Sequence, residues 1–138
     1  MATIIKPKLS TKNPYYISKH RYYELKHFCL QYPEWQKEYD RLEAERIPSN
    51  SIDIFNSGEY SDPTARLAME KSVLLDKMDL VNYCADMTDR DIGPYIRVAV
   101  IEGYSYDKLA ARLYVPCGRK EYYDLYRRFF YILDKERR

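Results

Sequence analysis

The residues best suited to chemistry lie on one side of the last predicted helix, which begins near Arg119. At 100° per residue this side and its margins carry cations, one carboxylate and planar groups: Arg119, Lys120, Tyr123, Asp124, Arg127, Arg128 and Tyr131. Cations bind phosphates and guanine, while planar or short polar side chains contact base edges in the major groove. The spacing therefore predicts a DNA-binding face. The alternative is an amphipathic terminal helix with solvated outer charges.

Other chemistries find little support in the sequence. The spacing of His20, His27 and Cys29 is not a recurrent set of metal ligands. Acidic pairs such as Asp76 and Asp79 fall in exposed helical patterns, where solvation explains them. The sequence contains no glycine-rich phosphate loop and no nucleophile elbow. We therefore expect no catalysis, no cofactor and no metal.

A second helix and a turn must position the basic face. Gly103 suits the end of a preceding helix, and Ser105 can cap the next one. Pro116 and Gly118 force the segment VPCG out of helical geometry. Between cap and turn, three small or apolar residues share one predicted face: Leu109, Ala110 and Leu113. The order of these parts predicts a helix-turn-helix.

The inner side of the last helix is a broad apolar stripe that should pack on a core. Its members are Tyr122, Leu125, Tyr126, Phe129 and Leu133. The segment 94–102 is almost wholly apolar and is predicted to be a buried helix. Together these segments predict a tri-helical unit over residues 94–134.

Composition bounds the class of protein. With 138 residues the chain predicts one domain with its own core. Four glycines among 138 residues favour a helical protein, and the 16 tyrosines are expected to pack rather than stack on bases. Three widely spaced cysteines fit free thiols in a reducing cytosol. No apolar segment approaches membrane-spanning length, so we expect a cytoplasmic protein without a membrane partner.

Charge is divided unevenly along the chain. Residues 1–31 carry six Lys or Arg against one Glu, and residues 103–138 carry nine against five acidic residues. Residues 32–102 carry eight against fifteen. A polyanion would be attracted to both ends and repelled by the middle.

The rest of the chain is predicted to divide into four segments. Residues 1–17 form a flexible basic arm, and residues 18–47 form a hairpin of two helices. Residues 48–61 form a linker loop. Residues 62–138 hold a long helix followed by the helix-turn-helix unit, so the fold class is all-α.

The long helix, predicted over residues 63–86, has two apolar stripes about 120° apart. The first consists of Leu67, Leu74, Met78, Val81 and Ala85. The second consists of Met69, Val73, Leu80 and Cys84. Two stripes require two neighbours. One is the domain's own core, and the other is the N-terminal hairpin or a second subunit, which would make a homodimer.

Short motifs between Tyr32 and Phe130 resemble a known family. YPEW, SDPTARLA and EYYDLYRRFF, in this order, resemble the RinA/ArpU-like bacteriophage late-gene transcriptional regulators, whose C-terminal part is similar to the promoter-reading domain of sigma factors. By position, Lys120, Glu121, Tyr122 and Tyr123 match the start of the family's recognition helix. One departure is the PCG turn, which is about two residues longer than usual.

The resemblance implies a sequence-specific binder of double-stranded DNA that regulates phage or prophage late genes. Host RNA polymerase is a further partner under this interpretation. A different class of function stays open: a helical assembly or packaging protein, such as a scaffold or a small-terminase-like subunit, with a helix-turn-helix fold.

Overall fold

A computed structural model describes residues 13–45 and 61–138 of the chain. These residues form helices and no strands, which confirms the all-α class. The six helices are α1 Lys19–Leu30, α2 Tyr32–Ala44, α3 Ser61–Thr88, α4 Gly93–Glu102, α5 Tyr106–Arg112 and α6 Arg119–Glu136. Most of the expected basic arm and of the linker loop lies outside the described residues. The described end of that arm is anchored, because Ile17 is buried in the core and the Tyr15 ring packs on Tyr131.

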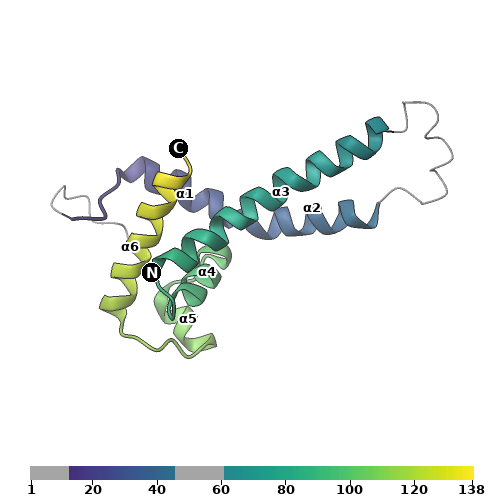
Figure 1. The fold of residues 1–138 in the computed structure, drawn as a ribbon. Helices are drawn as coiled ribbons and strands as arrows, with labels where there is room; N and C mark the ends of the chain where they lie inside the picture. The colour runs from purple at the N-terminus through teal and green to yellow at the C-terminus, as the bar shows by residue number, and fades with distance from the viewer. Residues whose placement is uncertain (1–12, 46–60) are drawn as a thin grey trace.

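The helices build a body with a projecting arm (Figure 1). In the body, α6 and α4 pack on the C-terminal part of α3, and α1 packs on α4 and α6. The arm consists of α2 lying along the N-terminal part of α3. At about 1.5 Å per residue the 28 residues of α3 span roughly 42 Å, so the helix is long enough to belong to both the body and the arm.

The two N-terminal helices do not pair as the expected hairpin. α2 packs mainly along α3, and α1 packs mainly on α4 and α6. Only Gln31 separates α1 from α2, and Pro33 begins the new helix in its first turn. An αα-hairpin needs a loop of about two to five residues to reverse the chain. One residue is too short, so α2 leads out into the arm.

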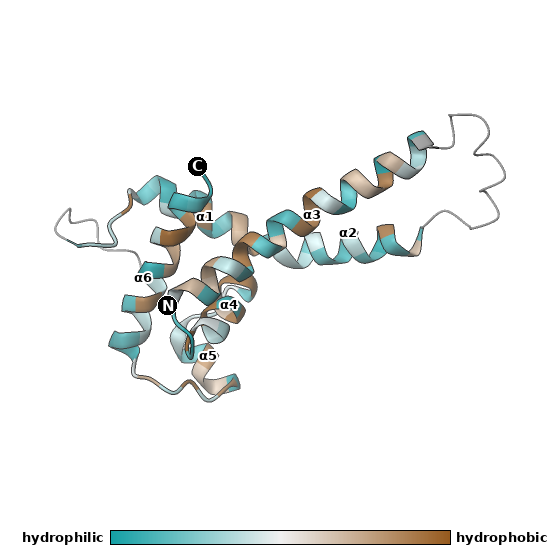
Figure 2. Ribbon diagram, viewed as in Figure 1, coloured by the Kyte–Doolittle hydropathy of each residue, from teal (hydrophilic) through white to brown (hydrophobic). Residues whose placement is uncertain are grey.

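The core of the body is rich in aromatic side chains. α6 contributes fully or almost fully buried residues along its inner side: Tyr122, Tyr126, Phe129, Phe130 and Leu133. Tyr22 of α1 meets this group, because its hydroxyl lies 2.8 Å from that of Tyr126. The predicted inner stripe of α6 is therefore correct, with Leu125 at its half-buried edge. Figure 2 shows hydrophobic residues gathered in the body, in contrast to the largely hydrophilic α2.

The turn between α3 and α4 brings the two helices into close contact. The Asp89 carboxylate accepts hydrogen bonds from the backbone N–H groups of Asp91 and Ile92, at 2.9 and 2.8 Å. At Gly93, a Cβ atom would lie 2.3 Å from the carbonyl oxygen of Ala85. Only glycine therefore fits where α4 starts against α3.

The cysteines in the body are free thiols, as expected. Cys29 and Cys84 are buried, and Cys117 is half-buried. Burial raises the pKa of Cys29, and it raises the pKa of Cys84 to about 12. Both thiols are therefore neutral near pH 7 and act as small apolar groups in the core.

The two predicted stripes of α3 have different outcomes. In the first, Met78, Val81 and Ala85 are buried, while Leu67 and Leu74 are half-buried. Leu74 packs against the core without being fully buried. In the second stripe Cys84 is buried and Leu80 packs on the core, but Met69 is 68% exposed and Val73 is 48% exposed.

Candidate nucleic-acid interface

The start of the helix-turn-helix has the geometry that the sequence predicted. Gly103 ends α4 in the left-handed conformation, with φ of 76°, and its N–H donates to the Ala99 carbonyl oxygen at 2.8 Å. Ser105 then caps α5, and its hydroxyl oxygen accepts from the backbone N–H of Lys108 at 3.2 Å. These two residues mark where α4 ends and α5 begins.

The apolar face predicted for α5 is wrong beyond its first residue. Leu109 is fully buried, whereas Ala110 and Leu113 are exposed. The reason is that α5 ends at Arg112, so Leu113 is extended and out of phase with the helix. The turn over residues 113–118 instead inserts Val115 into the core.

Tyrosines tie the turn to both helices. The Tyr106 hydroxyl donates to the Cys117 carbonyl oxygen at 2.8 Å, which fixes the turn against α5. The Tyr106 ring packs on that of Tyr122, with centroids 5.2 Å apart. The backbone N–H of Tyr106 donates to the Tyr123 hydroxyl at 2.9 Å. Residues from both helices and the turn therefore form one rigid contact.

Tyr123 is the clearest correction to the predicted DNA-binding face. Its side chain was expected to point outward, but it is 7% exposed and holds α5 in place. Burial is the main cause that raises its pKa. The buried arc of α6 is wider than one side of a wheel because α5 and α4 also contact the helix. Tyr123 is therefore a structural residue.

Arg119 and Lys120 are exposed at the start of α6. Arg119 forms an ion pair with Asp107 in the first turn of α5, and its guanidinium lies 5.5 Å from the centroid of the Tyr106 ring. The hydrogen bond that Arg119 donates to the Asp107 carboxylate raises the pKa of Arg119, which stays charged. Within the described part of the chain, Lys120 has no ion pair. Its ammonium is available to an anion.

The other predicted residues lie one and two turns further along α6. Arg127 donates to the Asp124 carboxylate at 2.6 Å, and the Arg127 side chain is only 15% exposed. Asp124 is exposed and Arg128 is half-buried. Arg127 therefore does not present a free guanidinium beside Lys120, and the exposed part of the predicted face is its N-terminal end.

Two cations of α5 complete the basic surface, and the sequence analysis missed them. Lys108 and Arg112 are exposed, four residues apart, and both lie over the Tyr104 ring, at 4.9 and 5.5 Å from its centroid. Their i, i+4 spacing in α5 was the available signal. We call Lys108, Arg112, Arg119 and Lys120 the cationic set. Tyr114, in the turn between the two helices, is 83% exposed.

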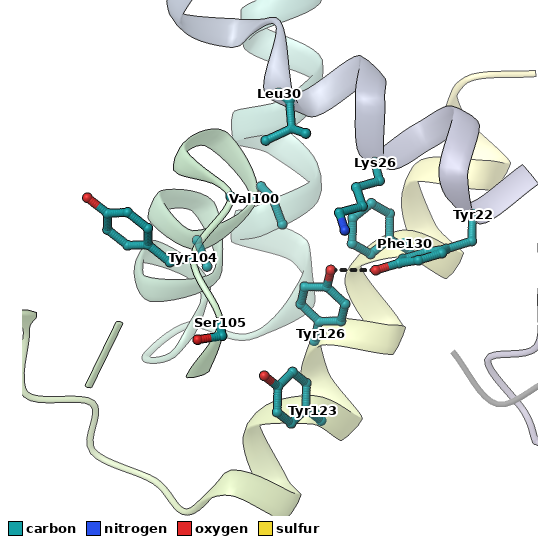
Figure 3. Close-up of a pocket in the computed structure, with 11 residues that line it drawn as sticks. Tyr22, Lys26, Leu30, Val100, Tyr104, Ser105, Tyr123, Tyr126 and Phe130 are labelled. Atoms are coloured by element: carbon teal, nitrogen blue, oxygen red, sulfur yellow. Dashed lines mark hydrogen bonds between the residues drawn. The ribbon is translucent and has the colours of Figure 1, made fainter. Parts of the chain in front are cut away.

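A small cavity lies behind this unit, between α1, the α4–α5 junction and α6 (Figure 3). Its volume is about 110 Å³, and among the described residues that line it Lys26 alone is charged. Tyr22 and Tyr126 meet in its wall through their hydroxyls. Burial raises the pKa of Tyr22 to about 12 and that of Tyr126 well above its usual range. Both hydroxyls are therefore neutral near pH 7 and supply neither a base nor a nucleophile. The cavity is also smaller than most ligand pockets, which enclose about 300 Å³ or more.

Across residues 13–45 and 61–138, no cluster of three or more His, Cys, Asp or Glu side chains is placed to hold a metal ion. None of the helices in this part of the chain has the length and apolarity to cross a membrane. Comparisons with protein-family models, curated proteins and solved structures give no match to this chain.

Proposed function

We propose that the chain binds double-stranded DNA through α5 and α6 and regulates transcription. The observation that supports this most is the exposed pair Arg119 and Lys120 at the start of an 18-residue helix, behind a rigid turn and a second helix that carries Lys108 and Arg112. A helix-turn-helix places the N-terminal residues of its second helix on base edges, while the first helix crosses the phosphate backbone. The N-terminal end of α6 also favours anions through its helix dipole.

Each residue has a role in this proposal. Lys120 contacts a guanine edge or a phosphate, and Asp124 accepts from cytosine or repels wrong sites. Lys108 and Arg112 neutralise phosphates and fix the register of the protein on the duplex. Arg119 has to exchange its Asp107 partner for a phosphate. Arg127 and Arg128 lie further along α6 than the residues that contact DNA. Arg127 orients the Asp124 carboxylate through its hydrogen bond.

The biological setting follows from the motifs that resemble the RinA/ArpU-like regulators. The chain would act in the cytoplasm of a bacterial host cell, at late genes of a phage or prophage. Host RNA polymerase would be its protein partner. The exposed turn residue Tyr114 is suited to such a contact because large aromatic side chains are enriched in protein interfaces.

Selection from a random duplex library, followed by binding titrations at low salt, tests the proposal. Lys120→Ala should weaken binding to the selected duplex by about 5- to 100-fold, as the loss of one good base or phosphate contact. Lys37→Ala is the matched control, because Lys37 is an exposed lysine on the arm helix α2. The proposal is wrong if both variants bind like the wild type, or if no duplex binds.

A second function, assembly or packaging through protein contacts, is favoured by a different observation. Asp107 and Asp124 already compensate Arg119 and Arg127, so part of the basic face is internally neutral. A surface of this kind suits a protein partner that needs few net charges. In that case Lys120→Ala would leave a negligible DNA affinity unchanged, while Tyr114→Ala would weaken partner binding.

A further inference from the structure

The arm carries an apolar groove of about 540 Å³ between α2 and α3. Leu42 of α2 and Leu74 of α3 lie along it, and Met69 and Val73 form an exposed wall. Exposed apolar side chains are ordinary when they are scattered singly. Here they stand one helical turn apart on one helix and border a groove, which is the form of a protein contact.

The exposed wall continues a stripe that is covered elsewhere. Met69 and Val73 lie on the same side of α3 as Leu80 and Cys84. In the body, Leu80 packs on the core and Cys84 is fully buried. The stripe is thus a single packing surface with a neighbour over its C-terminal half only. A second neighbour of similar size would cover the rest.

The charges at the rim of the groove indicate which neighbour fits. The rim holds two arginines, Arg41 and Arg66, and two glutamates, Glu38 and Glu70. A strongly acidic or basic partner, including a nucleic acid, gains nothing from a neutral rim. A second copy of the same rim fits, because across a two-fold axis an arginine of each copy can lie beside a glutamate of the other.

We propose that the arm is a dimerisation surface and that its occupant is the arm of a second copy. The two α3 helices cross in antiparallel fashion, so that the Met69 and Val73 side chains of each copy are covered by the partner's arm. Arg66 of one copy faces Glu70 of the other across the two-fold axis. This dimer does not depend on DNA binding. If the proposed function also holds, the dimer displays two helix-turn-helix units, which suits a palindromic site.

Molecular mass in solution tests the proposal, measured by sedimentation equilibrium on the full chain without DNA. The wild type should be a dimer, and Met69→Glu with Val73→Glu should make it a monomer with an unchanged circular dichroism spectrum. Leu75→Glu is the matched control, since Leu75 is an exposed leucine on another side of α3. That variant should remain a dimer.

Charge exchange separates this interface from any other apolar association. Arg66→Glu should weaken the dimer at least tenfold, because glutamates then face glutamates. Adding Glu70→Arg should restore it. A wild type that stays monomeric at about 100 μM, where a micromolar dimer would be formed, overturns the proposal. So does a dimer that survives the double glutamate substitution.

Discussion

The two halves of α3 carry the same two apolar stripes but lie in different environments. Over residues 78–85 both stripes are covered, because α6 and α4 lie on this half of the helix. Over residues 67–74 the first stripe is half-buried along α2, and the second is open at Met69 and Val73. A periodic apolar stripe therefore predicts that a neighbour is needed. It does not say whether this neighbour belongs to the same chain.

The sharpest way to test this difference is one substitution made in both halves. Met78→Ala should lower the free energy of unfolding by about 2–5 kcal/mol, because Met78 is 3% exposed and truncation leaves a cavity. Met69→Ala should change it by less than about 0.5 kcal/mol in the monomer. Urea unfolding at a protein concentration below dimerisation measures both. Equal losses would contradict the division of α3 into a covered and an open half.

Alkaline pH should destabilise the body through its buried tyrosines. In the unfolded chain a tyrosine has a pKa of about 10, and burial raises that of Tyr22 to about 12 in the folded protein. Between these values the unfolded state loses its proton first, so stability is complete below about pH 10 and falls as pH rises toward 12. The loss from Tyr22 should reach the order of 2–3 kcal/mol. Urea unfolding at pH 8, 10 and 11.5 measures it, and Tyr22→Phe should reduce the pH dependence. A flat profile to pH 11.5 would mean that these tyrosines are not buried.

Two buried tyrosines on α6 allow a finer comparison within the body. Tyr126→Phe removes the hydrogen bond to Tyr22 and should cost about 1 kcal/mol. The Tyr122 hydroxyl is buried without a hydrogen-bond partner among the described residues. Tyr122→Phe should therefore be neutral or stabilising, because an unsatisfied polar group is removed. Thermal unfolding of the two variants ranks them, and a larger loss for Tyr122→Phe would reverse the assignment.

The sequence predicted those parts of the fold that depend on local chemistry. Gly103 and Ser105 mark the boundary between α4 and α5 because backbone conformation and capping are properties of single residues. The inner stripe of α6 was also predictable from its period. The pairing of α2 with α3 was not, because it depends on the one-residue connection at Gln31 and on which helix offers a groove.

The candidate site was predictable only where one helix decides exposure. Arg119, Lys120 and Asp124 are exposed, as their positions at 100° per residue around the helix predicted. Tyr123 is buried against α5, where the backbone N–H of Tyr106 donates to its hydroxyl. The spacing of residues within α6 cannot show a contact with another helix. Arg127 is only 15% exposed and forms an ion pair with Asp124. The missed residues Lys108 and Arg112 lie on the other helix of the motif.

The salt dependence of duplex binding tests the proposed function most directly. If the cationic set of Lys108, Arg112, Arg119 and Lys120 neutralises phosphates, the logarithm of the binding constant should fall linearly with the logarithm of salt concentration. The expected slope is about −3 to −4 for each chain, at roughly −0.9 per phosphate contact. Wild-type protein that binds no duplex at low ionic strength, or binds with a slope near zero, would contradict a DNA-binding role for α5 and α6.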